Sequence, residues 1–181
     1  MSDMMQGRKC AFLRGVNVNG RKVIMKDVCD IFAKEGMKDV SSVLATGNIL
    51  FRSPLKNAEL RTMLESALSS HYSNKFELFI KDIRELEAII ENDPFDSFGE
   101  FHTYVFISEK GEEVEFERLF KGIVPAPNEE GVVNKGTFYW KVTKGDTLTS
   151  GFSKMIGRKD FKDKFTSRNI NTLERIMKCE D

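Results

Sequence analysis

Apolar residues recur along the chain first with strand-like and then with helix-like spacing. Residues 10–13 are consecutive and apolar, which is typical of a buried strand, and Arg14-Gly15 ends the run. From Met25 onward, apolar residues recur three and four positions apart, as they do on one face of a helix. Gly36 follows at the position where glycine commonly ends a helix. The pattern predicts a strand, a polar loop and an amphipathic helix.

A hairpin, a second helix and a closing strand complete this first set. The β-prone runs 40–45 and 49–52 flank Thr46-Gly47-Asn48, which favours a turn. An apolar stripe after Asn57 predicts a long helix, and residues 76–81 have strand character. The predicted order is β-α-β-β-α-β by about residue 81.

The same order of elements begins again after a connecting helix. Asp82, with Glu85 three positions later, matches a capping box at the start of that helix. A strand from Tyr104, a helix, a hairpin turning at Lys135-Gly136, a short helix and a strand follow. The last helix is expected from about Thr172. We expect Asn171 to be its N-cap. The order of elements repeats, without evident residue-level identity between the halves.

The predicted fold class is α+β, with two tandem ferredoxin-like β-α-β-β-α-β modules. Residues 1–82 are expected to form the first module and residues 83–101 a connecting helix and loop. Residues 102–181 are expected to form the second module with the C-terminal helix. A chain of 181 residues is long enough for two such small modules.

The net charge does not indicate a protein that binds phosphate backbones. Lysine plus arginine number 28, as do aspartate plus glutamate, whereas nucleic-acid-binding proteins usually carry a basic excess. A local basic stretch does occur from Lys154 to Arg168, with six cations against two acids. A solvated helix face is the simpler interpretation of that stretch.

Cysteine content and hydropathy favour a reducing compartment and no membrane insertion. The three cysteines are odd in number and scattered, so they do not form a disulfide framework. No apolar run approaches the ~20 residues that a membrane span needs, and the N-terminal residues lack a signal-peptide core. We therefore expect a cytoplasmic location and no membrane partner.

The loop from Arg14 to Lys22 follows the first strand and contains two glycines. Such a loop can bind an anion through its backbone N–H groups. Gly15 and Gly20 have the spacing of a P-loop, but Arg21 and Lys22 stand where lysine and a hydroxyl residue are needed. Nucleoside-triphosphate hydrolysis is therefore excluded. Unusual backbone angles at the glycines and asparagines are the structural alternative.

Three segments of the chain resemble a known family: FLRGVNVNGRKVIMKDV, LATGNILF and SRNINTLERI. The first two are similar to the LLRGINVGG…V-P-M and QSGNVVF segments of the bacterial "domain of unknown function" family numbered 1697. The third is similar to its TRNWNTVRKL segment, and Ser153-Lys154 resembles the S-K pair of the family in the preceding helix. Departures from the family pattern are Asn19, Ile24, Thr46 and Ile170. The resemblance implies a fold and marks residues, but it assigns no reaction.

The residues that the resemblance marks share cationic or amide character, apart from the glycines and one serine. We predict that they bind a ligand: Arg14, Asn17, Gly20, Gly47, Asn48, Ser153, Lys154, Arg168, Asn169 and Asn171. Guanidinium and amide groups suit a carboxylate, a phosphate or a nucleobase. Helix caps, turns and surface cations are the structural alternative.

Catalytic and metal-binding patterns are weak. The only histidines are His71 and His102, so neither a histidine-based triad nor a metal site is predicted, and no cofactor is expected. We interpret His102 as a structural residue. No catalytic residue and no reaction are assigned.

The favoured function is binding of a small anionic or polar ligand by a loop-built Arg/Asn/Lys site. One alternative is a single-stranded nucleic-acid-binding module, because ferredoxin-like sheets can stack bases on aromatics such as Phe12, Phe51 and residues 138–140. Core packing is the simpler role for those rings. Another alternative is an oligomeric scaffold without a ligand, and the sequence leaves a homodimer open.

Overall fold

The computed structural model describes residues 7–16, 23–95 and 99–179. The chain divides into two compact units. Unit 1 comprises residues 1–87 and 175–181, and unit 2 comprises residues 88–174. Each unit is described by itself below.

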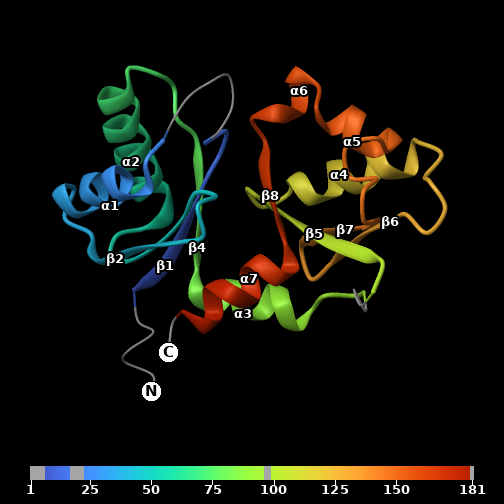
Figure 1. Cartoon of the computed structure of the whole chain (residues 1–181), viewed down its shortest axis with the longest axis horizontal. Helices are drawn as coiled ribbons and strands as arrows, with labels where there is room; N and C mark the ends of the chain where they lie inside the picture. The colour runs from blue at the N-terminus through green and yellow to red at the C-terminus, as the bar shows by residue number, and fades with distance from the viewer. Residues whose placement is uncertain (1–6, 17–22, 96–98, 180–181) are drawn as a thin grey trace. The chain divides into compact units, whose positions relative to one another are not determined.

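Unit 1 contains a four-stranded sheet, the helices that follow β1 and β3, and the first part of the helix that follows β4 (Figure 1). Its elements are β1 (Arg8–Leu13), α1 (Met25–Lys34), β2 (Lys38–Val43), β3 (Asn48–Arg52), α2 (Asn57–Tyr72) and β4 (Leu78–Asp82), which leads into α3 (Ile83–Glu91).

Unit 2 repeats this plan, with a shorter second helical segment that is split in two. Its elements are β5 (Phe101–Ser108), α4 (Glu112–Lys121), β6 (Glu130–Asn134), β7 (Thr137–Thr143), α5 (Gly151–Ile156), α6 (Lys159–Lys162) and β8 (Phe165–Asn169), which leads into α7 (Ile170–Lys178).

Both sheets have the strand order of a ferredoxin-like module. The orders are β2-β3-β1-β4 and β6-β7-β5-β8, and every neighbouring pair is antiparallel. In each unit the first helix crosses over to a strand two places away, and the third strand fills the gap. The predicted tandem ferredoxin-like fold is confirmed.

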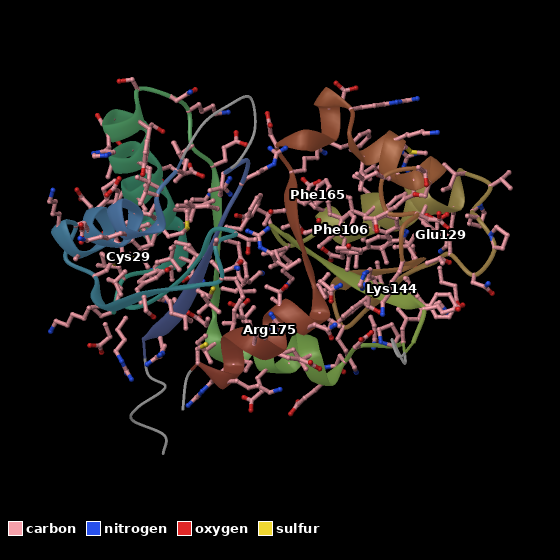
Figure 2. All side chains as sticks on the ribbon, viewed as in Figure 1. Cys29, Phe106, Glu129, Lys144, Phe165 and Arg175 are labelled. Atoms are coloured by element: carbon pink, nitrogen blue, oxygen red, sulfur yellow. The ribbon has the colours of Figure 1, made fainter. Side chains whose placement is uncertain are left out.

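Each unit has its own hydrophobic core between one face of its sheet and its helices. In unit 1, α1 and α2 lie on one face of the sheet, where Phe32 and Phe51 meet edge to face at 5.4 Å between ring centroids (Figure 1). In unit 2 the core is largely phenylalanine, and the stacked rings of Phe106 and Phe165 are 4.4 Å apart (Figure 2). Such aromatic pairs add to the stability that burial alone gives.

The expectation of a repeat without residue identity is wrong for the end of each unit. Both closing strands run directly into a nine-residue helix that begins with isoleucine. Isoleucine, leucine, glutamate and isoleucine then recur at equal spacing, at Ile83, Leu86, Glu87 and Ile89, and at Ile170, Leu173, Glu174 and Ile176. Strand register makes Lys9 and Asp82 of unit 1 equivalent to Tyr104 and Asn169 of unit 2.

The last helix begins two residues earlier than predicted. α7 starts at Ile170, and the side chain of Asn169 accepts a hydrogen bond from the Asn171 backbone N–H at 3.0 Å. Asn169 is therefore the N-cap, and the assignment of Asn171 to that position is wrong. One of the two hydrogen bonds of the capping box predicted for α3 is present, because Glu85 accepts from the Asp82 backbone N–H at 2.8 Å, while the Asp82 carboxylate binds Lys9.

Neither a membrane-spanning helix nor a cluster of metal ligands occurs among the described residues. Among residues 7–16, 23–95 and 99–179, no helix has both the length and the apolar character needed to cross a membrane. The same residues contain no group of three or more histidine, cysteine or acidic side chains placed to hold a metal ion.

Candidate functional site

The predicted ligand-binding residues are distributed over both units. Arg14, Gly47 and Asn48 belong to unit 1, whereas Ser153, Lys154, Arg168, Asn169 and Asn171 belong to unit 2. Asn17 and Gly20 lie outside the described residues. The contacts of each residue within its own unit are as follows.

Gly47 and Asn48 hold the β2–β3 turn against the end of β1. Gly47 has φ +81°, and its carbonyl accepts a hydrogen bond from the Leu13 N–H at 2.7 Å. The fully buried Asn48 side chain donates to the Val43 carbonyl and to the Thr46 hydroxyl, each at 3.0 Å. These contacts give both residues a structural role in the hairpin.

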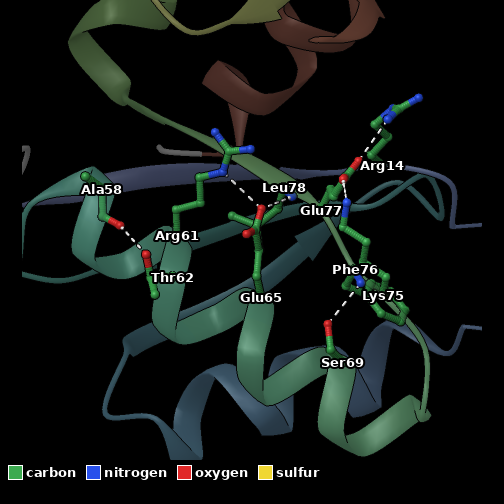
Figure 3. A network of polar contacts seen from close by, with 10 residues as sticks. All are labelled: Arg14, Ala58, Arg61, Thr62, Glu65, Ser69, Lys75, Phe76, Glu77 and Leu78. Carbon is green, nitrogen blue, oxygen red and sulfur yellow. Dashed lines mark hydrogen bonds and ion pairs between the residues drawn. The ribbon is translucent and has the colours of Figure 1, made fainter. Parts of the chain in front are cut away.

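Arg14 at the end of β1 binds a carboxylate of its own unit. Its guanidinium donates to Glu77 at 2.9 Å, and the other oxygen of that carboxylate accepts from the Lys75 ammonium at 2.5 Å (Figure 3). The Arg14 backbone N–H also donates to the Glu77 carbonyl at 3.0 Å. An external anion would have to compete with Glu77 for this guanidinium.

A second part of the same polar network joins α2 to β4. The Glu65 carboxylate accepts from the Arg61 guanidinium and from the Leu78 backbone N–H, both at 3.0 Å (Figure 3). The Arg61 guanidinium also lies 4.8 Å from the centre of the Phe79 ring. These contacts join helix α2 to strand β4 and give both side chains a structural role.

In unit 2, Ser153 and Lys154 lie in the short helix α5. The Ser150 hydroxyl accepts from the Ser153 backbone N–H at 3.0 Å and so caps the helix. Ser153 is half-buried and Lys154 is exposed. Ser153 therefore contributes a backbone donor to a cap, and the Lys154 ammonium lies at the surface.

Arg168 and Asn169 lie on opposite faces of the unit 2 sheet. Arg168 pairs with Val105 and Asn169 with Tyr104, and successive strand residues point to opposite faces. The Arg168 guanidinium donates to the Thr166 hydroxyl at 2.8 Å and to the Ser167 carbonyl at 2.9 Å. The two side chains cannot contribute to one site on one face of this sheet.

Asn169 instead contacts His102, a residue that the sequence analysis treated as structural. The Asn169 amide nitrogen lies 3.0 Å from His102 Nδ1. Among the described residues, His102 Nε2 has no hydrogen-bond partner, and the ring is only half-buried. His102 sits at the start of β5, where no local motif distinguishes it in the sequence.

Tyr104 and Thr147 extend this polar group beside His102. The His102 and Tyr104 rings meet edge to face at 5.9 Å, and Tyr104 lies 5.5 Å from the ring of Trp140. The Tyr104 hydroxyl is 3.5 Å from the Thr147 hydroxyl. Trp140 is fixed by its hydrogen bond to the buried Glu129 carboxylate at 2.9 Å. We refer to His102, Tyr104, Thr147 and Asn169 as the His102 cluster.

At the equivalent position of the unit 1 sheet, Lys9 and Asp82 form an ion pair. The ammonium of the buried Lys9 binds the Asp82 carboxylate at 2.5 Å and the Asn57 side-chain oxygen at 2.8 Å. Lys9 is equivalent to Tyr104, and Asp82 to Asn169. In unit 1 these polar groups bond one another, whereas in unit 2 Nε2 of His102 has no hydrogen-bond partner among the described residues.

The pKa of His102 is lowered, first by burial and then by the positive charge of Lys144. The unfolded chain therefore takes up a proton on this histidine at a higher pH than the folded chain. We expect the associated stability to be present above about pH 6.5 and lost as the pH falls through the lower folded pKa. Urea unfolding at several pH values, on wild type and His102→Gln, measures the effect.

A His71→Gln variant is the matched control, because His71 is the other histidine of the chain. The acid-side loss of stability should be smaller in His102→Gln and unchanged in His71→Gln. Equal losses in wild type and His102→Gln would show that His102 does not contribute.

The chain was compared with families, curated proteins and solved structures. The model of a family described as "Protein of unknown function (DUF1697)" matches residues 6–139. No curated protein matches the chain. A solved structure of the conserved bacterial protein SP0830 from Streptococcus pneumoniae is similar in fold, with a TM-score of 0.77 and 22% identity. That match covers 96% of this chain and 98% of the other.

Proposed function

We propose that this chain, which belongs to the DUF1697 family of proteins of unknown function, is a small-molecule-binding protein whose polar ligand occupies the His102 cluster. No reaction is assigned. The proposal retains the predicted class of small anionic or polar ligand. Of the predicted site residues it retains Asn169, and it adds His102, Tyr104 and Thr147 at one end of the unit 2 sheet.

The observation that carries the proposal is the contrast between equivalent positions in the two units. Lys9, Asp82 and Asn57 bond one another in unit 1. In unit 2 the corresponding residues are Tyr104 and Asn169, and His102 presents Nε2 without a partner among the described residues. A half-buried ring nitrogen without a hydrogen-bond partner among the described residues is a group that a polar ligand can bind.

Charge near the cluster supports an anionic or polar ligand. Lys144 is close enough to His102 to influence its pKa, and its ammonium donates to the Gly99 carbonyl at 2.5 Å. Lys144 is exposed and can exchange that carbonyl for a negatively charged group. Thr147 adds a hydroxyl that can donate or accept.

Little supports the nucleic-acid alternative. Phe12, Phe51 and the aromatic residues 138–140 are buried, so these rings do not form an exposed stacking surface. Phe51 belongs to the core of unit 1, and Phe138 and Trp140 belong to the core of unit 2, which supports their interpretation as core residues. Within the basic stretch from Lys154 to Arg168, Phe161 is half-buried and Phe165 is buried, and the net charge of the chain is zero.

A thermal-shift screen tests the proposal. The panel contains carboxylates, phosphosugars, nucleotides and neutral polar compounds, measured on wild type, His102→Gln and His71→Gln. A ligand at a hundred times its dissociation constant should stabilise the native state by about 2.7 kcal/mol. We expect at least one compound to stabilise wild type and His71→Gln but not His102→Gln.

The two histidine variants distinguish the cluster from other sites. A compound that stabilises all three proteins equally binds elsewhere and contradicts the proposed location. A panel that stabilises none of them, with all three proteins folded, contradicts the proposed function and favours the scaffold alternative.

A further inference from the structure

The side-chain amide of Asn169 has a fixed orientation. Its oxygen accepts the Asn171 backbone N–H at 3.0 Å and caps helix α7. Rotating the amide by half a turn would place its NH₂ group against that N–H, so that two donors would face each other. The cap therefore keeps the oxygen on the helix side and directs the NH₂ group to the other side.

This orientation determines which nitrogen of His102 carries the proton. The Asn169 amide nitrogen is 3.0 Å from His102 Nδ1. Because the amide nitrogen is a donor, Nδ1 must be the acceptor, and the proton of the neutral ring is on Nε2. A cap on one element thus sets the hydrogen-bonding character of a half-buried group on another strand of the same unit.

We infer that Asn169 is a positioning residue that holds His102 in its Nε2–H tautomer, so that the site selects ligands that offer an oxyanion acceptor. The inference rests on the proposed function, because it names the ligand chemistry of that site. The nearby ammonium of Lys144 favours the same chemistry. A carboxylate oxygen and a phosphate oxygen are both negatively charged acceptors of this kind, whereas a cationic donor is not.

The first measurement determines the tautomer of His102 in the absence of any ligand. Nitrogen-15 NMR of the full chain at pH 8 distinguishes a protonated Nε2 from a protonated Nδ1, and His71→Gln assigns the signals. We expect the Nε2–H form of His102 to exceed the other by about tenfold in wild type. A predominant Nδ1–H form in wild type would overturn the inference.

Two substitutions separate the capping role of Asn169 from its effect on the His102 tautomer. Asn169→Asp and Asn169→Ser both keep a capping oxygen, but both lose the amide NH₂ group. In Asn169→Asp the carboxylate should accept from Nδ1, move the proton to that nitrogen and raise the pKa of His102 by about one unit. Asn169→Ser should leave the two tautomers mixed. Unchanged tautomer populations in both variants would show that Asn169 does not position the ring.

The ligand class is tested with simple probes. Inorganic phosphate and acetate should shift the His102 signals of wild type, and methylammonium should not. In Asn169→Asp the response to both anions should fall at least about tenfold, because the carboxylate repels them and Nε2 no longer donates when the ring is neutral. If the tautomer is as expected but neither anion perturbs His102, the oxyanion class is wrong. If no compound of any class perturbs it, the proposed function itself fails.

Discussion

Replacing Gly47 with alanine is expected to lower the free energy of unfolding by about 2–4 kcal/mol. Gly47 has φ +81°, which costs a residue with a side chain about 1 kcal/mol or more. An added Cβ would also lie 2.6 Å from Val16 Cγ2 and 3.0 Å from Leu13 Cβ. Val16 and Leu13 are buried, so they cannot move aside without disturbing the core.

Gly136 offers a matched control for this substitution. It occupies the equivalent hairpin position in unit 2 with φ +78°, and a Cβ there would meet nothing within 4 Å. Gly136→Ala should therefore lower the free energy of unfolding by only about 1 kcal/mol, which is the cost of the positive φ for a residue with a side chain. Urea unfolding of both variants measures the difference. Equal losses would mean that the close approach at Gly47 has no energetic consequence.

Asp82→Ala is expected to destabilise the protein by about 1–3 kcal/mol. It removes the carboxylate that binds the Lys9 ammonium and leaves this buried cation bound to the Asn57 side-chain oxygen at 2.8 Å. The Lys9 side chain is 8% exposed and that of Asp82 is 48% exposed, so solvent screens part of the interaction. The expected loss is therefore below that of a fully buried pair.

Adding Lys9→Met to the Asp82→Ala variant tests the cause of that loss of stability. If the uncompensated ammonium is responsible, the double variant should be more stable than Asp82→Ala alone, because the buried charge is gone. Denaturant unfolding of the four proteins in this cycle gives the coupling free energy between the two residues. Strict additivity would show that Lys9 and Asp82 do not interact.

The fold was predictable because its determinants are local. Apolar periodicity gave the order of the strands and helices, and Gly47 and Lys135-Gly136 marked turns that the structure contains. The repeat of individual residues was not evident in the sequence because the two units differ in length between equivalent positions. Lys9 and Tyr104 are separated by more positions than Asp82 and Asn169, so no single period aligns the two halves.

The environment of the candidate site was less predictable because it depends on contacts between distant residues. Arg14 binds Glu77, and His102 binds Asn169, each across more than sixty positions. The chemical character of Arg14 and Asn48 indicated binding groups, but it could not indicate that both have partners within unit 1. A shift of two residues in the start of α7 made Asn169, not Asn171, the cap.

The most direct test of the account is a histidine NMR titration with each compound that stabilises the protein. The carbon-bound protons of His71 and His102 give one set of signals each, and the two residues lie in different units. A ligand in the His102 cluster should move the His102 signals and leave those of His71 in place. A stabilising compound that moves only His71, or neither histidine, would contradict the location of the site.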